Sequence, residues 1–136
     1  NNKKIDVYNY GKMRRDFTFI DDLVNGIISL IDIPPNSAIK RSPELKKVDS
    51  LSPVANFRVV NIGNAASISL EEFIKAIETS LGRNAEKNFL PMQPGDVPET
   101  IADNALLVQL TGSKPKTDIG EGVNAFVNWY KEFYKI

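Results

Sequence analysis

The fold of this chain is decided by the stretch Lys12-Met13-Arg14-Arg15-Asp16-Phe17-Thr18-Phe19-Ile20-Asp21-Asp22. Two adjacent arginines meet an acidic residue, and a long apolar helix follows at once. Residues 15–18 are interpreted as a short strand, and Thr18, with Asp21 three residues later, as the cap of the helix. A fixed cation therefore lies beside a helix start that anchors it in a core, which favours an anion-binding corner.

The helix that follows this stretch is the first of three amphipathic helices. Its apolar positions recur at helical spacing, and Pro34-Pro35 ends it. Ser69 and Glu72 form a capping box at the start of a second helix, which Gly82 ends. Thr117 is expected to cap the last helix, and Asp103 a short helix over residues 105–110. The buried positions expected on the first helix are Ile20, Leu23, Val24, Ile27, Ile28 and Ile31, and those on the last are Ile119, Val123, Phe126, Val127, Tyr130 and Phe133.

Short strands are predicted between the helices. They cover residues 5–8, residues 57–63 and residues 89–92, and the nearly continuous apolar character of 57–63 indicates a strand buried in a parallel sheet. Residues 9–12 read as a turn, and residues 36–56 as a long surface loop. The pattern predicts one α/β domain over residues 1–136, with about four helices.

Composition excludes several kinds of function. The chain has 136 residues, 42% of them hydrophobic and 25% charged, with a formal net charge of zero. A neutral chain argues against a nucleic-acid or membrane-surface partner. With no cysteine and no histidine, the chain offers no thiol catalysis, disulfides, Ser-His-Asp triad or His-based metal site. Neither a dinucleotide-binding Gly-x-Gly-x-x-Gly nor a Walker motif is found in the 136 residues.

Three groups of polar residues are candidates for chemistry, and each has a structural alternative. Arg15 can bind a diphosphate bidentately, or pair with a neighbouring aspartate. The turn from Gln93 to Asp96 presents an amide and a carboxylate that can bind sugar hydroxyls or phosphate, although such turns are common. Asp21 and Asp22 are read as structural, because adjacent helical residues do not face each other and acids favour a first turn. The aromatic residues of the last helix, Trp129, Tyr130, Phe133 and Tyr134, are read as packing residues.

The sequence resembles the nucleotide-sugar epimerases and dehydratases of the extended short-chain dehydrogenase family. The resemblance rests on an ordered set of motifs that covers nearly the whole chain: Lys12 to Asp22, Val59-Val60-Asn61-Ile62-Gly63-Asn64, Gln93-Pro94-Gly95-Asp96-Val97 and the helix from Gly122 to Tyr134. Its strongest form is with bacterial UDP-glucuronate 4-epimerases. It implies a carboxyl-terminal, substrate-binding part of a Rossmann-type enzyme that contributes elements to the edge of the Rossmann sheet.

The resemblance also implies roles for individual residues. The arginine that matches Arg15 binds the diphosphate of a UDP-sugar, and Asp6, Val7 and Tyr8 match the segment beside the uracil. Gln93 to Asp96 match the segment that closes over ribose and phosphate. Many galactose epimerases have an arginine where this chain has Gln93, so fewer cations from this half hold the diphosphate.

In the family, NAD accepts the hydride from C4 of the sugar while a tyrosine of a Tyr-x-x-x-Lys pair takes the hydroxyl proton, and the hydride returns to the other face of a 4-keto intermediate. The chain is expected to lack the Tyr-x-x-x-Lys pair, because Tyr130-Lys131 and Tyr134-Lys135 do not have this spacing. We predict that the chain contributes no catalytic residue, binds no metal and is inactive alone, with NAD bound by the amino-terminal half of a longer protein.

Two further functions stay open. One is a UDP-sugar decarboxylase or nucleotide-sugar dehydratase, and the other is a stand-alone, non-catalytic module that binds nucleotides or a protein. The chain begins at Asn1 rather than methionine and runs directly into a strand, which is typical of a chain entered in its middle or of a processed terminus. We expect a cytoplasmic isomerase of polysaccharide biosynthesis, a homodimer as the whole protein and a monomer as this piece, with no membrane or nucleic-acid partner.

Overall fold

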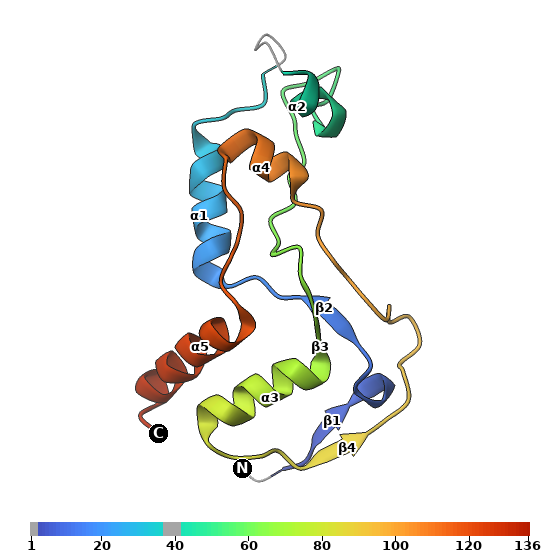
Figure 1. Ribbon diagram of the computed structural model, residues 1–136, viewed down its shortest axis with the longest axis vertical. Helices are drawn as coiled ribbons and strands as arrows, with labels where there is room; N and C mark the ends of the chain where they lie inside the picture. Colours follow the sequence, from blue (N-terminus) through green and yellow to red (C-terminus); the bar gives the residue numbers. More distant parts are fainter. Residues whose placement is uncertain (1–2, 37–41) are drawn as a thin grey trace. The chain divides into compact units, whose positions relative to one another are not determined.

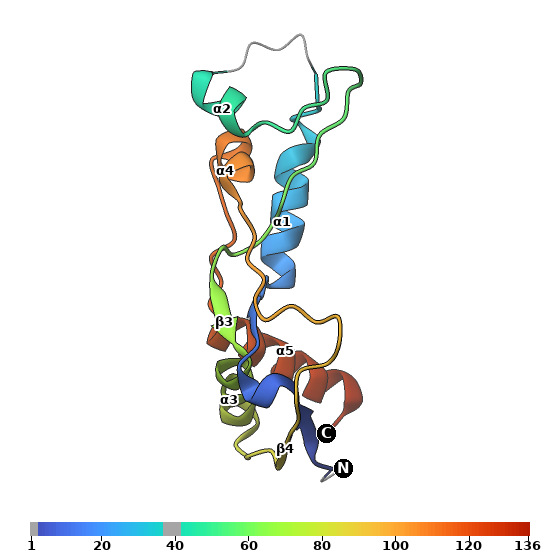
Figure 2. The ribbon, with the colours of Figure 1, turned by 90° about the vertical axis from the view of Figure 1, so that its right-hand side faces the viewer.

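The chain divides into two compact units in the computed structural model, which describes residues 3–36 and 42–136 (Figures 1 and 2). The first unit comprises residues 1–17, 66–101 and 117–136, and the second comprises residues 18–65 and 102–116. Each unit has buried apolar residues of its own. The sequence predicted a single domain over residues 1–136, and what the structure contributes is this division into two units.

Two small sheets form the frame of the first unit. Strand β1 (Ile5–Val7) runs parallel to β4 (Lys87–Phe89), and β2 (Arg14–Asp16) runs antiparallel to β3 (Ser67–Ser69). The strand predicted at residues 5–8 is confirmed within one residue. The strand expected at 15–18 begins one residue earlier, and the one expected at 89–92 lies at 87–89. The latter ends before Pro91, because proline has no N–H to donate to a ladder.

The turn predicted at residues 9–12 is a short 3₁₀ segment, η1 (Tyr8–Gly11), between β1 and β2. Asn9, Tyr10 and Gly11 have φ values of 49°, 51° and 82°. A Cβ on Gly11 would lie 2.9 Å from Oε1 of Glu71 in helix α3 (Leu70–Leu81), and the φ of Gly11 is one that residues with side chains rarely adopt.

Helices α3 (Leu70–Leu81) and α5 (Ile119–Tyr134) pack side by side in the first unit (Figure 1). The capping box is confirmed: Ser69 accepts from the backbone N–H of Glu72, and the Glu72 carboxylate accepts from that of Ser69. Gly82 ends α3 with φ of 69°. The buried apolar residues of this unit are Val7, Met13, Ile74, Val123 and Val127.

Two expectations for α5 are wrong. Its N-cap is Asp118, whose carboxylate accepts from the N–H of Glu121, and not Thr117. The expected core positions Phe126, Tyr130 and Phe133 are exposed, because only one stripe of the helix faces α3. The aromatic rings contact one another instead, as Trp129 stacks on Phe133 with 5.4 Å between ring centroids.

The second unit contains α1 (Ile20–Ile31), α2 (Pro43–Val48) and α4 (Ala105–Thr111). Leu106 and Leu107 are buried, and Gly26 lets α1 approach Ile62, where an added Cβ would lie 3.0 Å from a methyl carbon. Helix α4 begins after Asn104, and the Asp103 carboxylate accepts from the N–H of Ala105. Asp103 is therefore one residue before the N-cap position expected of it.

The predicted cap of α1 is wrong, because the N-cap is Phe19, whose side chain makes no capping bond, and not Thr18. The cap and the helix start lie one residue later than expected, and Asp21 and Asp22 lie in the first turn. The Asp22 carboxylate accepts from the N–H of Lys116. The structural reading of Asp22 is supported by this bond, and the first-turn position agrees with the same reading of Asp21.

The apolar face of α1 is not buried, contrary to prediction. Between 42% and 68% of the surface of its five large β-branched residues is exposed: Ile20, Val24, Ile27, Ile28 and Ile31. The helical period itself is correct, because the helix forms with these residues on one side. Within the described residues of its unit, α1 packs on α4 and on Ile62, which cover too little of this stripe.

The strand predicted at residues 57–63 does not form. Phe57 and Val59 are 59% and 56% exposed, and this segment belongs to none of the strands among the described residues. A strand requires a neighbouring strand to complete its hydrogen bonds. The N–H of Val59 donates instead to the Ser50 hydroxyl, at 3.1 Å, so the apolar sequence lacks a sheet to join in this part of the chain.

The region predicted as a long loop at residues 36–56 contains helix α2, which the sequence pattern did not predict; residues 37–41 lie outside the described residues. Ser42 caps α2 by accepting from the N–H of Leu45. Asp49, just after the helix, forms a bidentate ion pair with Arg58 at 2.8 and 3.3 Å. This pair fastens the segment after α2 to residue 58.

Candidate functional site

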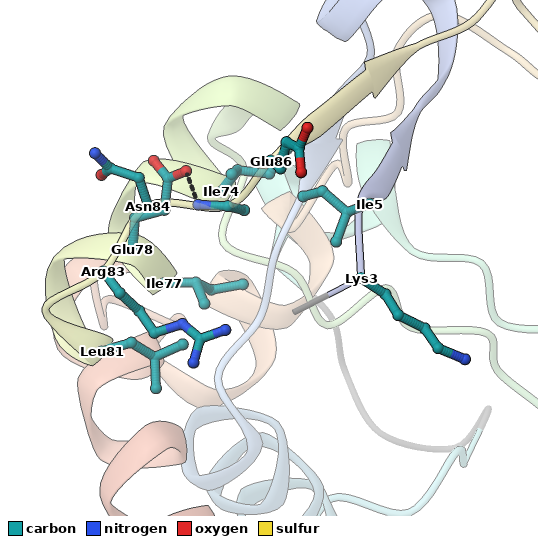
Figure 3. Close-up of a pocket in the computed structure, with 10 residues that line it drawn as sticks. Lys3, Ile5, Ile74, Ile77, Glu78, Leu81, Arg83, Asn84 and Glu86 are labelled. Carbon is teal, nitrogen blue, oxygen red and sulfur yellow. Dashed lines mark hydrogen bonds between the residues drawn. The ribbon is translucent and has the colours of Figure 1, made fainter. Parts of the chain in front are cut away.

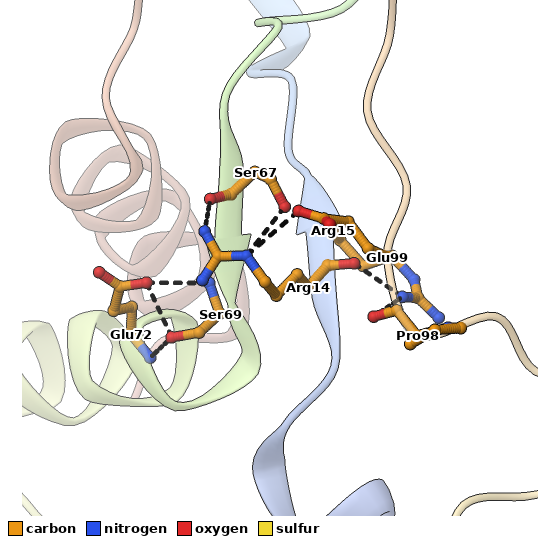
Figure 4. Close-up of polar contacts among 7 residues, drawn as sticks. All are labelled: Arg14, Arg15, Ser67, Ser69, Glu72, Pro98 and Glu99. Atoms are coloured by element: carbon orange, nitrogen blue, oxygen red, sulfur yellow. Dashed lines mark hydrogen bonds and ion pairs between the residues drawn. The ribbon is translucent and has the colours of Figure 1, made fainter.

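The arginine corner lies in the first unit, where β2, β3 and the segment after residue 97 meet (Figure 4). Arg14 Nε donates to the Ser67 hydroxyl and to the Glu99 carboxylate, each at 3.2 Å, and Nη2 donates to the Ser67 carbonyl oxygen. The backbone of Arg14 accepts from Thr100 and donates to Pro98. Arg14 therefore connects two separate segments to β2.

Arg15 points to the other side of β2, because successive side chains of a strand alternate. Its Nη1 group donates to the carbonyl oxygens of Arg14 at 2.7 Å and Pro98 at 3.4 Å (Figure 4). Among the described residues of this unit, no carboxylate forms an ion pair with Arg15. Arg15 as a residue is half-buried, and its guanidinium is oriented by neutral carbonyls, which leaves its positive charge available to an anion.

The loop from Pro91 to Val97 is anchored at both ends to the segment that carries Arg15. At its start the N–H of Leu90 donates to Val7, and Leu90 accepts from Tyr10; at its end Pro98 accepts from Arg14. The predicted turn is confirmed, because the N–H of Asp96 donates to the Gln93 carbonyl oxygen and Gly95 has φ of 89°. Gln93 is exposed and Asp96 is half-buried.

The remaining predicted residues lie on β1 and at its end. Asp6 accepts from the Asn88 side chain at 2.9 Å, Val7 is 1% exposed, and Tyr8 is half-buried. Val7 is therefore a core residue that would contact a ligand only through its backbone. Pairing of β1 with β4 and of the loop ends with residues 7–15 brings all six predicted residues into one unit.

Two carboxylates near the arginine corner, those of Glu72 and Glu99, have lowered pKa values. Hydrogen bonds from the backbone and hydroxyl of Ser69 lower the pKa of Glu72, and the Ser67 hydroxyl followed by the Arg14 guanidinium lowers the pKa of Glu99. Both groups are therefore held as anions by local donors. Glu99 is the carboxylate that faces Arg14, which sets Arg14 apart from Arg15.

A cavity of about 450 Å³ lies elsewhere in the first unit, between the start of the chain and the end of α3 (Figure 3). Its apolar lining consists of Ile5, Ile74, Ile77 and Leu81. No predicted site residue lines it. Residues 3–36 and 42–136 contain no cluster of acidic side chains that could hold a metal ion, and none of their helices is long and apolar enough to cross a bilayer.

Similar proteins were found by sequence and by structure, although no family model matches the chain. A probable UDP-glucuronate 4-epimerase of Rhizobium meliloti is 47% identical over 99% of this chain and 39% of its own length. Protein CapI of Staphylococcus aureus is 46% identical over 99% of this chain and 40% of its length. The UDP-glucuronic acid 4-epimerase of Bacillus cereus, solved with UDP-glucuronic acid and NAD, is 27% identical with a TM-score of 0.72, over 98% of this chain and 37% of that one.

The chain resembles the carboxyl-terminal part of an NAD-dependent nucleotide-sugar epimerase. It spans about two fifths of the length of the curated relatives it matches. The resemblance in sequence and the expected α/β class are confirmed. UDP-glucuronic acid and NAD are ligands of the whole matched epimerase from Bacillus cereus.

The prediction that the chain lacks the tyrosine–lysine spacing of the epimerases is wrong. The spacing Tyr-x-x-x-Lys, which Tyr130 and Tyr134 lack, does occur at Tyr8 and Lys12. Residues four apart lie on the same face of an α-helix, but Asn9 and Tyr10 between them have φ values of 49° and 51°, which a right-handed helix does not contain. Tyr8 and Lys12 therefore do not form a helical tyrosine–lysine pair, and the absence of a catalytic residue stays a prediction.

Sequence reasoning missed the residues that surround Arg15. These residues are Ser67, Pro98 and Glu99, which lie 52 or more positions from Arg15 in the sequence. They meet Arg14 or Arg15 only because β2 pairs with β3 and because Arg14 forms a β-bridge with Glu99. One signal was present: two adjacent arginines on a strand must point to opposite faces, so they cannot share one role.

Proposed function

We propose that this chain is the UDP-sugar-binding part of an NAD-dependent nucleotide-sugar 4-epimerase, which interconverts UDP-glucuronate and UDP-galacturonate through a 4-keto intermediate. The names and complexes of the similar proteins support the reaction class. The observation that carries the binding role is Arg15, a guanidinium oriented by two carbonyl oxygens and paired with no carboxylate among the described residues of its unit.

In this proposal Arg15 binds the diphosphate. A charge-assisted hydrogen bond contributes about 1.5–3 kcal/mol, and a guanidinium can form two in parallel with phosphate oxygens. Asp6, Val7 and Tyr8 lie beside the uracil, with Val7 contributing backbone groups because its side chain is buried. Gln93 and Asp96 close over the ribose and phosphate from the loop that ends at Pro98.

NAD is assigned to a part of the protein outside this chain. The described residues contain no strand that leads through a glycine-rich turn into a helix: β1 continues into the η1 turn, and β3 continues directly into α3. They therefore do not fit the dinucleotide, and no step of the hydride transfer is assigned to them. We further propose that the whole protein is a cytoplasmic homodimer of polysaccharide biosynthesis, in keeping with the lack of cysteine.

The decisive experiment is Arg15→Ala in the full-length protein that contains this chain, with UDP binding measured by calorimetry. Losing one charge-assisted bond of about 1.5 kcal/mol or more weakens binding about tenfold or more. The matched control is Arg83→Ala, which removes the same charge from a residue that lines the cavity at the end of α3, in the same unit. Equal UDP affinity in the wild type and Arg15→Ala would refute the assigned site.

A further inference from the structure

We propose that Arg14 and Glu99 position Arg15 and the loop of residues 91–97 for binding the nucleotide diphosphate, without themselves contacting the ligand. The inference rests on the proposed function and assigns these two residues a role within the same site. It starts from the difference between the two neighbouring arginines, of which one faces a carboxylate and the other does not.

Arg14 connects three segments. Its side chain donates to Ser67 on β3 and to Glu99 after the loop (Figure 4). Its backbone accepts from Thr100 and donates to Pro98. Glu99 also forms a parallel bridge with Arg14. These bonds fix the end of the loop against β2, within one residue of Arg15.

The Pro98 carbonyl transmits this connection to Arg15. It accepts from the backbone N–H of Arg14 at 2.9 Å and from Arg15 Nη1 at 3.4 Å. Displacing residues 98–99 from β2 would therefore withdraw one of the two carbonyl oxygens that orient the Arg15 guanidinium. It would also free one end of the loop that carries Gln93 and Asp96. If the guanidinium becomes ordered only when the ligand binds, the entropy cost of ordering it weakens the affinity for the ligand.

Electrostatics and positioning predict opposite changes in UDP affinity for Glu99→Ala, and this difference makes the positioning role testable. Removing a carboxylate near the site raises the local positive potential and, by charge alone, strengthens binding of an anion. If Glu99 holds Arg14 and the loop in place, its removal weakens binding instead. Arg14 and Glu99 are 44% and 51% exposed as side chains, so their ion pair contributes little to overall stability, and the melting temperature is expected to change little.

The experiment measures UDP affinity by calorimetry in the full-length protein for Glu99→Ala, Glu99→Gln and Glu86→Ala. Glu86→Ala is the matched control, because Glu86 is an exposed carboxylate of the same unit that pairs with Lys4. We expect Glu99→Ala to weaken UDP binding about fivefold, which corresponds to about 1 kcal/mol. Glu99→Gln, which keeps an oxygen acceptor for Arg14, should restore most of the affinity, and the control should leave it unchanged.

A double variant separates positioning from general disruption. If Glu99 acts partly through Arg15, adding Glu99→Ala to Arg15→Ala weakens UDP binding less than Glu99→Ala weakens it in the wild type, because one of the two positioned parts is already absent. Stronger or unchanged binding in Glu99→Ala, or an additive loss in the double variant, would overturn the proposal. If Arg15→Ala alone leaves UDP binding intact, the proposed function fails; if only the Glu99 variants behave like wild type, the positioning role alone fails.

Discussion

At the residue scale, Arg14 and Arg15 show how one strand gives two identical side chains different roles. Arg14 meets Glu99 and Ser67 on one face of β2, while Arg15 on the other face is oriented by carbonyl oxygens. An ion pair neutralises a guanidinium, whereas carbonyl dipoles orient it and leave its charge unpaired. The difference between the neighbours is what makes Arg15 the better candidate for an anion.

Glu72 supplies a pH prediction at the same scale. The Ser69 backbone and hydroxyl lower its pKa below the usual value of 4.5. A carboxylate with a depressed pKa in the folded state stabilises the fold fully above its unfolded pKa, and this contribution is lost as the pH falls through the lower folded pKa. Glu72→Gln keeps an acceptor for the capping box but removes the titration.

We therefore expect the wild type to have a higher free energy of unfolding than Glu72→Gln at neutral pH, with the difference vanishing in acid below the folded pKa. Urea titrations at several pH values measure this difference. The control is Glu71→Gln, a neighbouring acid in the first turn of α3 that lies outside the capping box. A gap between wild type and Glu72→Gln that stays constant across the pH range would contradict the assignment.

At the scale of elements, α1 forms with the predicted period but keeps its apolar stripe exposed. The unpaired apolar segment at residues 57–62 approaches this helix through Ile62 and Gly26. Because the relatives are about two and a half times as long as the matched region, we expect the remainder of a longer protein to cover both. An apolar segment and an apolar helix face that are exposed together are typical of elements that complete a sheet and its helical layer.

Substituting Ile28→Asp tests this expectation, since Ile28 is 56% exposed on the stripe. In the 136-residue chain the change should alter stability by less than about 0.5 kcal/mol, as for a surface position. In the full-length protein it should destabilise by more than about 2 kcal/mol, because an unpaired charge would be buried. Thermal melting of both lengths measures this, with Asn25→Asp as the control off the stripe; equal effects of Ile28→Asp in both lengths would refute it.

At the scale of the whole molecule, the product distinguishes the reaction classes. A 4-epimerase converts UDP-glucuronate into a product of unchanged mass, whereas a decarboxylase or a dehydratase releases carbon dioxide or water. We expect the full-length protein with NAD to yield an isomer separable by chromatography but not by mass. A lighter product would replace the epimerase proposal, and binding of UDP without turnover would favour the non-catalytic module.

The sequence by itself determined those features that depend on neighbours within a few residues. The capping box at Ser69, the stop at Gly82 and the turn at Gln93 to Asp96 were all predicted, because a cap or a turn is completed by side chains and backbone three or four positions apart. The family motifs were equally local, since each is a short run read directly from the chain.

Only the tertiary structure decided which faces are covered and which polar groups meet. The apolar stripes of α1 and α5 show their period in the sequence, yet burial depends on a partner surface that periodicity does not specify. Thr18 and Thr117 failed as caps because a shift of one residue places a different side chain at the helix end. Arg14 meets Glu99, 85 positions away, because strand pairing joins distant segments, and no local pattern encodes that contact.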